Sequence, residues 1–522
     1  MARYTLASSL RACPPRWAAL GLFTGLALLF YGRYLTHLPE GLHAWAQADR
    51  LSLALNFYDF GFDFWHPRTS ALLSIGGITG VEFPLPAYLA ALGGLLFGRG
   101  AIPTLFRLLN VAAAVLGFWY LFRLVYERTG NFIGGLVPGA FLLSAPTYAF
   151  YAGTFLPDPV SLSLSFVGYY YWLRFFDSRN FRSLLLALLV LTVASLLKTT
   201  TALYLAAVVG ITVLWACQEP DLLTARQRRL LLVAVGASFG ALGLFIQHNQ
   251  RLNAAYASEQ FLATIRPIAN AEDYHRVWSN IRRAWFREYA TKTMYAMLAA
   301  CIPVVLWRLR PYLRRPRLPL LLLFAASVPL AYLFYKLLGV QLDVHDYYII
   351  CSFMPPAILL LVLALLELGR PQGRGKVLIT TGLGLLVVWL VGSGYFRLQQ
   401  RFSDDYPPFS QFYTHAWMRG GADLLKQLRV PPTARILVLD DPAPNLALVY
   451  FDRRGLTWQP ALSTLSSAGI LQKMAGDSLN YVIMSPAAYQ QLPDHPALRA
   501  DFVVLTEQPA AVLRRRKTNV AW

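Results

Sequence analysis

The amino-acid sequence predicts an α-helical protein that crosses a membrane about eleven times and ends in a small α/β domain. The first observation is composition, because 56% of the 522 residues are hydrophobic and only 14% are charged, against about 25% charged in soluble domains. The second is clustering, since the apolar residues gather in runs long enough to cross a bilayer. Together they exclude an ordinary soluble enzyme.

Twelve apolar segments of roughly membrane length follow a basic N-terminal stretch, residues 1–16. They are 17–35, 81–98, 104–122, 131–151, 159–176, 183–199, 201–217, 230–247, 291–307, 318–338, 347–368 and 377–396. A helix needs about 20 apolar residues to cross the hydrocarbon layer. Segment 81–98 differs from the others, because one Glu and two Pro fall within its first six residues. We therefore expect a re-entrant or juxtamembrane helix there and eleven full spans.

The placement of basic residues supports this count. The formal net charge is +20, and cytoplasmic loops of membrane proteins carry an excess of Lys and Arg. With eleven spans and a cytoplasmic N-terminus, nineteen basic residues fall inside, among them Arg308, Arg310, Arg314, Arg315, Arg317 and Arg370. The short outer turns near 152–158, 198–200 and 339–346 hold one, Lys198. Counting 81–98 as a span would place most of these basic clusters on the outer side of the membrane.

This topology divides the chain into a cytoplasmic N-terminus (1–16), a transmembrane domain (17–398) and an exoplasmic C-terminal domain (399–522). The transmembrane domain has two long outer loops, at about 36–103 and 248–290. After Pro407 the sequence turns mixed polar, and β-type runs at 434–440, 481–484 and 501–505 alternate with helix-like stretches. That alternation predicts a small α/β domain.

The first outer loop is dense in ionisable and aromatic residues, which a simple connector does not need. They are His43, Trp45, Asp49, Arg50, Asp59, Asp63, Trp65, His66, Arg68 and Glu82. Carboxylates for proton transfer, cations for an anionic group and aromatic rings for sugar stacking suit a site that handles a polar substrate beside lipid. The alternative is a folded loop with ordinary surface charges.

Three further positions stand at the outer ends of spans. Asp158 precedes Pro159, and Glu82 lies just ahead of Pro84, so helix capping or the helix dipole explains either carboxylate as well as a functional role does. Lys198 is either a residue that snorkels from a span end or, as the lone cation in the short outer turns, the partner of an anion.

Two other outer segments combine polar and aromatic groups. Loop 248–290 holds six arginines and two tryptophans, which suits a lipid-linked phosphate or a helix lying on the membrane. The run Asp343-Val-His-Asp-Tyr-Tyr348 places His345, Tyr347 and Tyr348 at the outer surface. The tyrosines fit either an interfacial belt or a substrate site.

The order and sidedness of these motifs resemble the GT-C glycosyltransferases. The resemblance rests on Trp45-Ala-Gln-Ala-Asp49-Arg50, Glu82-Phe-Pro-Leu-Pro86, Pro157-Asp158, Lys198 and His345-Asp-Tyr-Tyr348, and it covers about residues 17–350. Within that superfamily the chain is similar to the dolichyl-phosphate-mannose protein mannosyltransferase family (glycosyltransferase family 39) and to bacterial aminoarabinose transferases that modify lipid A.

The resemblance implies a role for each motif. It makes Asp49 the catalytic carboxylate and gives Lys198 and Arg50 the phosphate of a polyprenyl-phosphate sugar donor. Glu82 and Asp158 would line the same cavity, with His43, His345, Tyr347 and Tyr348 as further substrate contacts. In some relatives the matching acidic pair holds a divalent metal ion, so Glu82 and Asp158 are also candidate metal ligands.

The implied reaction is inverting transfer of a sugar to a lipid, glycan or protein acceptor on the exoplasmic face of, by this resemblance, the bacterial inner membrane. Sugar and acceptor stay open, because Arg50 follows Asp49 directly and Phe83 stands where aminoarabinose transferases have a lysine. A polymerase or ligase acting on lipid-linked chains fits the same motifs. A transporter or flippase is the rival class, but it would carry its ionisable residues near mid-span.

Overall fold

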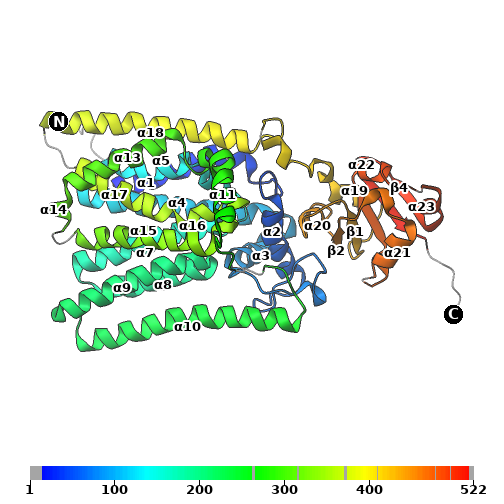
Figure 1. The fold of residues 1–522 in the computed structure, drawn as a ribbon, viewed down its shortest axis with the longest axis horizontal. Helices are drawn as coiled ribbons and strands as arrows, with labels where there is room; N and C mark the ends of the chain where they lie inside the picture. The colour runs from blue at the N-terminus through cyan, green and yellow to red at the C-terminus, as the bar shows by residue number, and fades with distance from the viewer. Residues whose placement is uncertain are drawn as a thin grey trace, which may run out of the picture.

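The computed structural model has two parts, a long bundle of helices and a smaller α/β domain at one end of it (Figure 1). It describes residues 14–261, 265–313, 317–369, 373–407, 409–476, 478–493 and 495–516. Most of the predicted cytoplasmic N-terminus lies outside these ranges, as do three basic residues of the predicted inner clusters, Arg314, Arg315 and Arg370.

All twelve predicted apolar segments form helices. These are α1 (Pro15–Tyr31), α3 (Leu85–Phe97), α4 (Ile102–Thr129), α5 (Phe132–Ser144) with α6 (Pro146–Ala152), α7 (Asp158–Ser178), α8 (Phe181–Leu197), α9 (Ala202–Gln218), α10 (Ala225–Ala255), α13 (Lys292–Trp307), α15 (Leu318–Leu338), α16 (Tyr348–Ser352) with α17 (Met354–Leu368), and α18 (Gly373–Arg401). By length and composition, five helices of the described ranges could cross a membrane, or up to seven if each of two bent helix pairs is one span. Multiple membrane spans are thus supported, while the count of eleven stays a prediction.

One predicted span, 131–151, is broken in the structure. The chain bends by 85° between α5 and α6, because Pro146 has no N–H to continue the helix and holds Ala145 in an extended conformation (φ −76°, ψ 108°). The bend turns α6 away from the axis of α5. Its Thr147 and Tyr151 thereby reach residues of the candidate site described below.

Helix α3 agrees with the predicted short helix. Its 13 residues are too few for the hydrocarbon thickness. It packs between α4 and α2 (Ala44–Asp59), a helix of the first outer loop. Its last residues, Leu95, Leu96 and Phe97, are exposed, as suits an apolar helix end at a lipid surface.

The second outer loop and the connections are also helical in part. They contain α11 (Ala271–Asn280), a π-helical turn at Ile281–Trp285, α12 (Phe286–Tyr289) and α14 (Leu309–Tyr312). In Figure 1 α14 and the start of α18 lie at the end of the bundle away from the C-terminal domain. Which of the two ends faces the cytoplasm stays a prediction.

The C-terminal domain is a five-stranded sheet with helices around it. Its strands are β1 (Ile436–Leu439), β2 (Gly455–Trp458), β3 (Tyr481–Met484), β4 (Phe502–Thr506) and β5 (Ala511–Arg515), and its helices are α19 (Gly421–Gln427), α20 (Leu446–Tyr450), α21 (Ser467–Ala475), α22 (Pro486–Gln490) and α23 (His495–Asp501). The three predicted β-runs are confirmed as β1, β3 and β4, whereas β2 and β5 went unpredicted. The strand order is β2-β1-β3-β5-β4. Strands β2 and β3 run parallel to β1, and β5 runs antiparallel to β3 and β4.

The C-terminal domain is tied to the first outer loop through the edge of its sheet. Gly455 N donates to Ser70 O (3.1 Å), and Leu72 N donates to Gly455 O (2.8 Å). A side chain at Gly455 would meet Ile436 O at 1.8 Å, so only glycine fits there. Side chains of α2, α3 and the C-terminal domain share one buried apolar cluster. The domain is therefore docked onto the loop.

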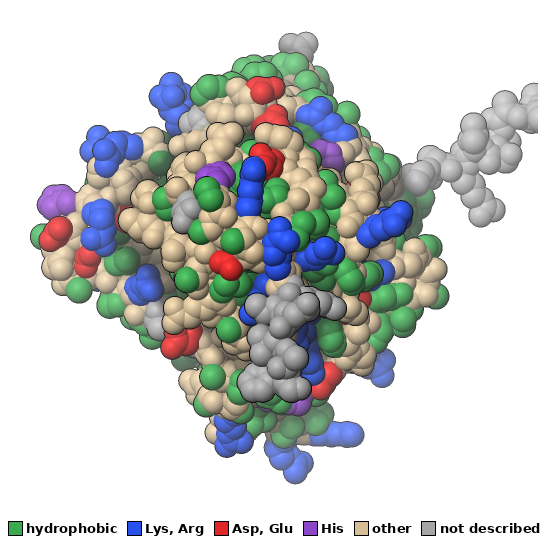
Figure 2. Space-filling model, turned by 90° about the vertical axis from the view of Figure 1, so that its right-hand side faces the viewer, with side chains coloured by type: hydrophobic (Ala, Val, Ile, Leu, Met, Phe, Trp, Pro, Cys, Tyr) green, Lys and Arg blue, Asp and Glu red, His purple; other side chains and the backbone are tan. Residues whose placement is uncertain are grey.

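Figure 2 looks onto this end of the molecule. Lysine and arginine side chains and aspartate and glutamate side chains are scattered over it among hydrophobic side chains. Mixed charge of this kind is typical of a surface in water.

The predicted sidedness can be tested with introduced cysteines at three exposed positions, in a variant whose native cysteines are replaced by serine. We expect Glu272→Cys and Lys473→Cys to react with a membrane-impermeant maleimide in intact cells. Leu313→Cys should react only after permeabilisation. Labelling of Leu313→Cys in intact cells, with protection of the other two, would invert the topology.

Candidate active site

The candidate site is built around α2, in the first outer loop. The side-chain amide of Gln47 donates to Glu40 O (2.9 Å) and Leu42 O (3.1 Å), which holds the turn that leads into the helix. Twelve of the sixteen residues of α2 are buried, Asp49 among them. A helix this buried fixes its side chains closely, because their neighbours leave few alternative rotamers.

The Asp49 carboxylate lies inside the protein, between an arginine and an asparagine. Asn445 Nδ2 donates to Asp49 Oδ1 (2.9 Å), and Arg50 Nη1 lies 3.8 Å from Asp49 Oδ2. Burial raises the pKa of Asp49 to about 6, against the opposing effects of Arg50 and of the Asn445 hydrogen bond. The group is therefore a base that changes its protonation state close to neutral pH.

A network of ion pairs extends from Arg50. Arg50 Nη2 lies 2.5 Å from Glu82 Oε2, and Lys198 Nζ lies 2.8 Å from Glu82 Oε1 and 3.2 Å from Asp158 Oδ1. Burial acts to raise the pKa of Glu82, but Lys198 and Arg50 outweigh it and lower that pKa to about 2. Glu82 is thus an anion that bridges two cations.

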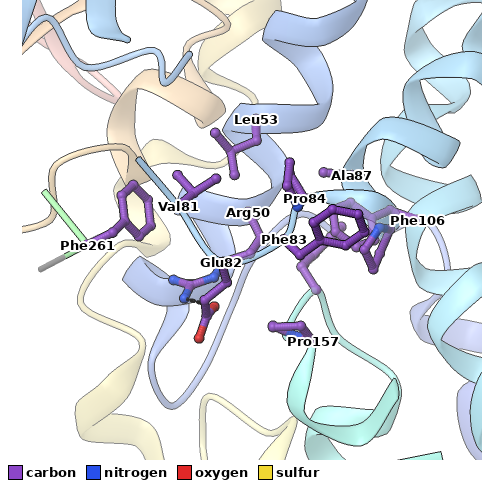
Figure 3. Close-up of a pocket in the computed structure, with 12 residues that line it drawn as sticks. Arg50, Leu53, Val81, Glu82, Phe83, Pro84, Ala87, Phe106, Pro157 and Phe261 are labelled. Carbon is purple, nitrogen blue, oxygen red and sulfur yellow. Dashed lines mark hydrogen bonds and ion pairs between the residues drawn. The ribbon is translucent and has the colours of Figure 1, made fainter. Parts of the chain in front are cut away.

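Four separate parts of the chain supply this network. Glu82 stands in the extended segment before α3, Asp158 is the first residue of α7, and Lys198 follows the last residue of α8. Figure 3 shows Arg50 and Glu82 pointing toward each other beside a small pocket whose wall includes Phe83, Phe106 and Phe261. The apolar wall strengthens the electrostatic interactions at its edge.

Two tyrosines cover Lys198 on another side. The Lys198 ammonium lies 5.6 Å from the ring centre of Tyr347 and 4.9 Å from that of Tyr348. Both distances fit cation–π contacts. Both tyrosines therefore contact the cluster, and their role as substrate contacts stays a prediction.

The two histidines join the same cluster. His43 and His345 stack with ring centres 5.5 Å apart, and the Tyr347 ring lies 5.2 Å from His43. Burial lowers the pKa of His43 to about 4 and lowers the pKa of His345 as well. Both rings are therefore neutral at pH 7 and offer hydrogen bonds without charge.

The structure thus brings all nine predicted site residues into one connected cluster. Three other residues that adjoin the cluster were not predicted, namely Asn445, Asp346 and Arg401. Asn445 comes from the C-terminal domain, about 400 positions from Asp49, and no local pattern marks it. Asp346 and Arg401 form a fully buried ion pair, 2.5 Å between Oδ2 and Nη2, to which Tyr151 adds a hydrogen bond of 2.6 Å. Asp346 lies within the run Asp343–Tyr348 identified in the sequence, so its position in that run could have marked it as a site residue.

The arginines of the second outer loop are not all close to this cluster, although, besides burial, the charge of Arg266 contributes to the lowered pKa of His345. Arg276, for example, pairs with Asp273 (2.7 Å) and Asp343 (3.2 Å) on the surface. Binding of a lipid phosphate by this loop stays a prediction.

The metal ion predicted at Glu82 and Asp158 does not suit their arrangement. The Lys198 ammonium lies between the two carboxylates, in the space that a cation would need. Among the described residues no group of three or more His, Cys, Asp or Glu side chains could hold a metal, and such sites normally draw on several ligands. A metal here remains only a prediction, and no chemical step below depends on one.

Comparison with known proteins supports the resemblance seen in the sequence. Residues 81–241 match the family model of dolichyl-phosphate-mannose-protein mannosyltransferase, a region that contains Glu82, Asp158 and Lys198. No curated protein matches the chain.

Two solved structures share the fold over most of the chain. One is ArnT from Cupriavidus metallidurans bound to undecaprenyl phosphate, with a TM-score of 0.61 and 14% identity, covering 97% of this chain and 99% of ArnT. The other is the oligosaccharyltransferase of Archaeoglobus fulgidus in complex with Zn and sulfate, with a TM-score of 0.51 and 11% identity, covering 94% of this chain and 71% of that one. The predicted GT-C resemblance is therefore confirmed, as a shared fold and a partial family match.

Proposed function

We propose that the protein is a membrane glycosyltransferase that moves a sugar from a polyprenyl-phosphate carrier to an acceptor on the exoplasmic face, with Asp49 as the base. The observation that carries the proposal is Asp49 itself, a buried carboxylate whose pKa is raised to about 6 and which stands next to cations held by ion pairs. A general base works best when its pKa lies near the working pH.

The reaction is a single displacement. The acceptor hydroxyl or amine attacks the anomeric carbon, and the bond between that carbon and the phosphate oxygen breaks on the opposite face. Asp49 takes the proton of the attacking group, and the phosphate leaves as polyprenyl phosphate with the electron pair of the broken bond. One displacement inverts the anomeric configuration.

Arg50 and Lys198 are the groups that stabilise the leaving phosphate. Both lie within reach of one carboxylate, Glu82, so an anionic phosphate at the same place meets two converging cations. Cations fixed in advance lower a barrier more than cations that must move during the reaction. Glu82 keeps the two side chains extended and in place until the donor arrives.

A polyprenyl carrier agrees with the surroundings of the site. The cluster stands at the ends of apolar helices, where a lipid phosphate would lie. ArnT, which shares the fold, was solved with undecaprenyl phosphate bound. The ionisable cluster lies at helix ends and in loops rather than at mid-span, so it does not favour the transporter alternative.

The direct test of this function is release of polyprenyl phosphate by the purified protein in nanodiscs supplied with polyprenyl-phosphate sugars. We expect the wild type to release it and Asp49→Asn to lose at least about a hundredfold in kcat, since general-base catalysis contributes about 10²–10⁴. Asp63→Asn, an exposed aspartate of the same loop, is the matched control. Wild-type turnover by Asp49→Asn would remove Asp49 from this role.

The pH dependence follows from the raised pKa of Asp49. A base must be deprotonated, so kcat/KM should fall about tenfold per pH unit below the pKa of about 6. The Asn445 hydrogen bond lowers this pKa, so Asn445→Ala should move the acid limb to higher pH. The Asn445→Ala variant should then lose more kcat/KM at pH 6 than at pH 8. Asn480→Ala, in the same domain, should leave the pH profile of kcat/KM unchanged. An equal loss at every pH would mean that Asn445 does not act through Asp49.

Lys198 should act on donor binding as well as on catalysis. We expect Lys198→Ala to raise the KM for the donor by about tenfold or more, since loss of a charge-assisted contact costs about 1.5–3 kcal/mol. Lys336→Ala, an exposed lysine near the end of α15, is the control. An unchanged donor KM in Lys198→Ala, with normal expression and folding, would place the phosphate elsewhere.

A further inference from the structure

A second cavity lies between the C-terminal domain and the first turn of α2. Its volume is about 920 Å³, which is the size of a small-molecule site. One wall consists of residues 41–45, which lead into and begin α2. The facing wall consists of residues from the C-terminal domain and the chain that leads into it, among them Trp417, Asp440 and Gln459. We call it the interdomain cavity.

The topology of the sheet places this cavity at a position suited to ligands. Strand β1 lies between β2 and β3 and runs parallel to both. The chain passes from β1 to β2 on one side and reaches β3 on the other, which makes the carboxyl end of β1 a topological switch point. Open α/β sheets bind their ligands there.

The residues that follow these three strands all line the interdomain cavity. Asp440 comes directly after β1, Gln459 directly after β2 and Ser485 directly after β3. Asp440 has a φ of +63°, an uncommon conformation that aspartate tolerates better than most residues. The edge thus presents a carboxylate, an amide and a hydroxyl side by side.

The charges of the wall exclude one class of ligand. The described residues that line the cavity include two aspartates and no lysine or arginine. A phosphate group would therefore meet repulsion rather than a partner. The ligand is neutral or positively charged.

The remaining wall has the composition that a sugar needs. Trp45, Phe412 and Trp417 line the cavity together with Gln411, Thr414 and His415. Trp45 keeps 37% of its surface exposed. Aromatic faces stack on the C–H faces of a pyranose ring, while amides, carboxylates and hydroxyls bind its hydroxyl groups.

His415 gives a second and independent sign of a ligand. Its side chain is 2% exposed, and its Nε2 atom has no hydrogen-bond partner among the described residues. An unsatisfied buried polar atom costs free energy. A bound hydroxyl group would supply the missing partner.

The interdomain cavity also adjoins the proposed active site. His43 and Trp45 line the cavity, and both contact the His345 ring, at 5.5 Å and 5.9 Å between ring centres. Asp49 follows Trp45 by one turn along α2. Asp49 does not itself line the cavity, so a saccharide there would lie about one helical turn from the proposed base.

We propose that the interdomain cavity binds a carbohydrate, and that this carbohydrate is the sugar part of the acceptor. The assignment of the carbohydrate as the acceptor rests on the proposed function. Carbohydrate binding itself rests only on the cavity. The acceptor assignment makes the nucleophile a sugar hydroxyl or amine rather than a serine or threonine hydroxyl of a protein.

The experiment is saturation-transfer-difference NMR on the full-length protein in nanodiscs. The probes are cellobiose, lactose, N,N′-diacetylchitobiose and chitobiose, with a Ser/Thr-rich pentapeptide for comparison. We expect saturation transfer from the protein to at least one disaccharide and no saturation transfer to the peptide. Trp417→Ala and Asp440→Asn should each weaken the signal about two- to tenfold, the range of one lost stacking or hydrogen-bonding contact. Trp278→Ala, in the separate apolar cavity beside α11, is the matched control.

The outcomes separate the two proposals. Transfer to no disaccharide, or equal transfer to wild type and both variants, overturns the cavity as a carbohydrate site even if polyprenyl phosphate is released normally. Transfer to the peptide alone favours a protein acceptor and overturns it too. Displacement of the disaccharide by the polyprenyl-phosphate sugar assigns the cavity to the donor and overturns the acceptor assignment. Disaccharide binding without any polyprenyl phosphate release supports the site and contradicts the proposed function.

Discussion

The carboxylate of Glu82 is the interaction on which the candidate site depends. It holds Arg50 from α2 and Lys198 from the end of α8, and Lys198 in turn holds Asp158 at the start of α7. Four segments that are distant in the sequence are thereby fixed at one point. A buried charge without a partner is costly, so removing one member of such a network leaves the others under strain. The same cost keeps Arg50 and Lys198 paired with Glu82 and ordered.

Asp49 and Asp158 show how different surroundings divide the work among similar groups. Asp158 and Glu82 face a lysine, and both serve to hold cations. Asp49 is 6% exposed, contacts a neutral amide, and lies farther from its nearest cation, at 3.8 Å. Burial raises the pKa of both Asp49 and Asp158, but Asp158 lies 3.2 Å from the Lys198 ammonium, whereas Asp49 has no cation that close among the described residues. The groups that surround each carboxylate, and not the residue type, therefore distinguish Asp49 from Asp158.

Much of this arrangement was predictable from sequence, for identifiable reasons. Apolar length predicted the helices, and the density of ionisable residues marked loop 36–103, which contains Asp49 and Glu82. Lys198 stood out as the lone cation of the short outer turns, and the family resemblance singled out Asp49. The break at Ala145 was missed because the apolar run continues through it, although Pro146 was visible. Strand β2 was missed because its four residues have too little pattern. Asn445 could not be found, since its role depends on how a separate domain docks and its neighbours in sequence carry no sign of it.

The docking of the sheet edge onto residues 69–72 has a consequence for biosynthesis. Loop 36–103 leaves the ribosome early, but the strand that pairs with it, β2, and the amide that supports Asp49 belong to the last fifth of the chain. Proteins are made from the N-terminus, so the loop stands incomplete, with unpaired backbone groups, until the C-terminal domain has folded. A nascent or prematurely ended chain therefore inserts its helices without assembling the carboxylate in its working environment. Completion of the polypeptide is therefore what assembles the site.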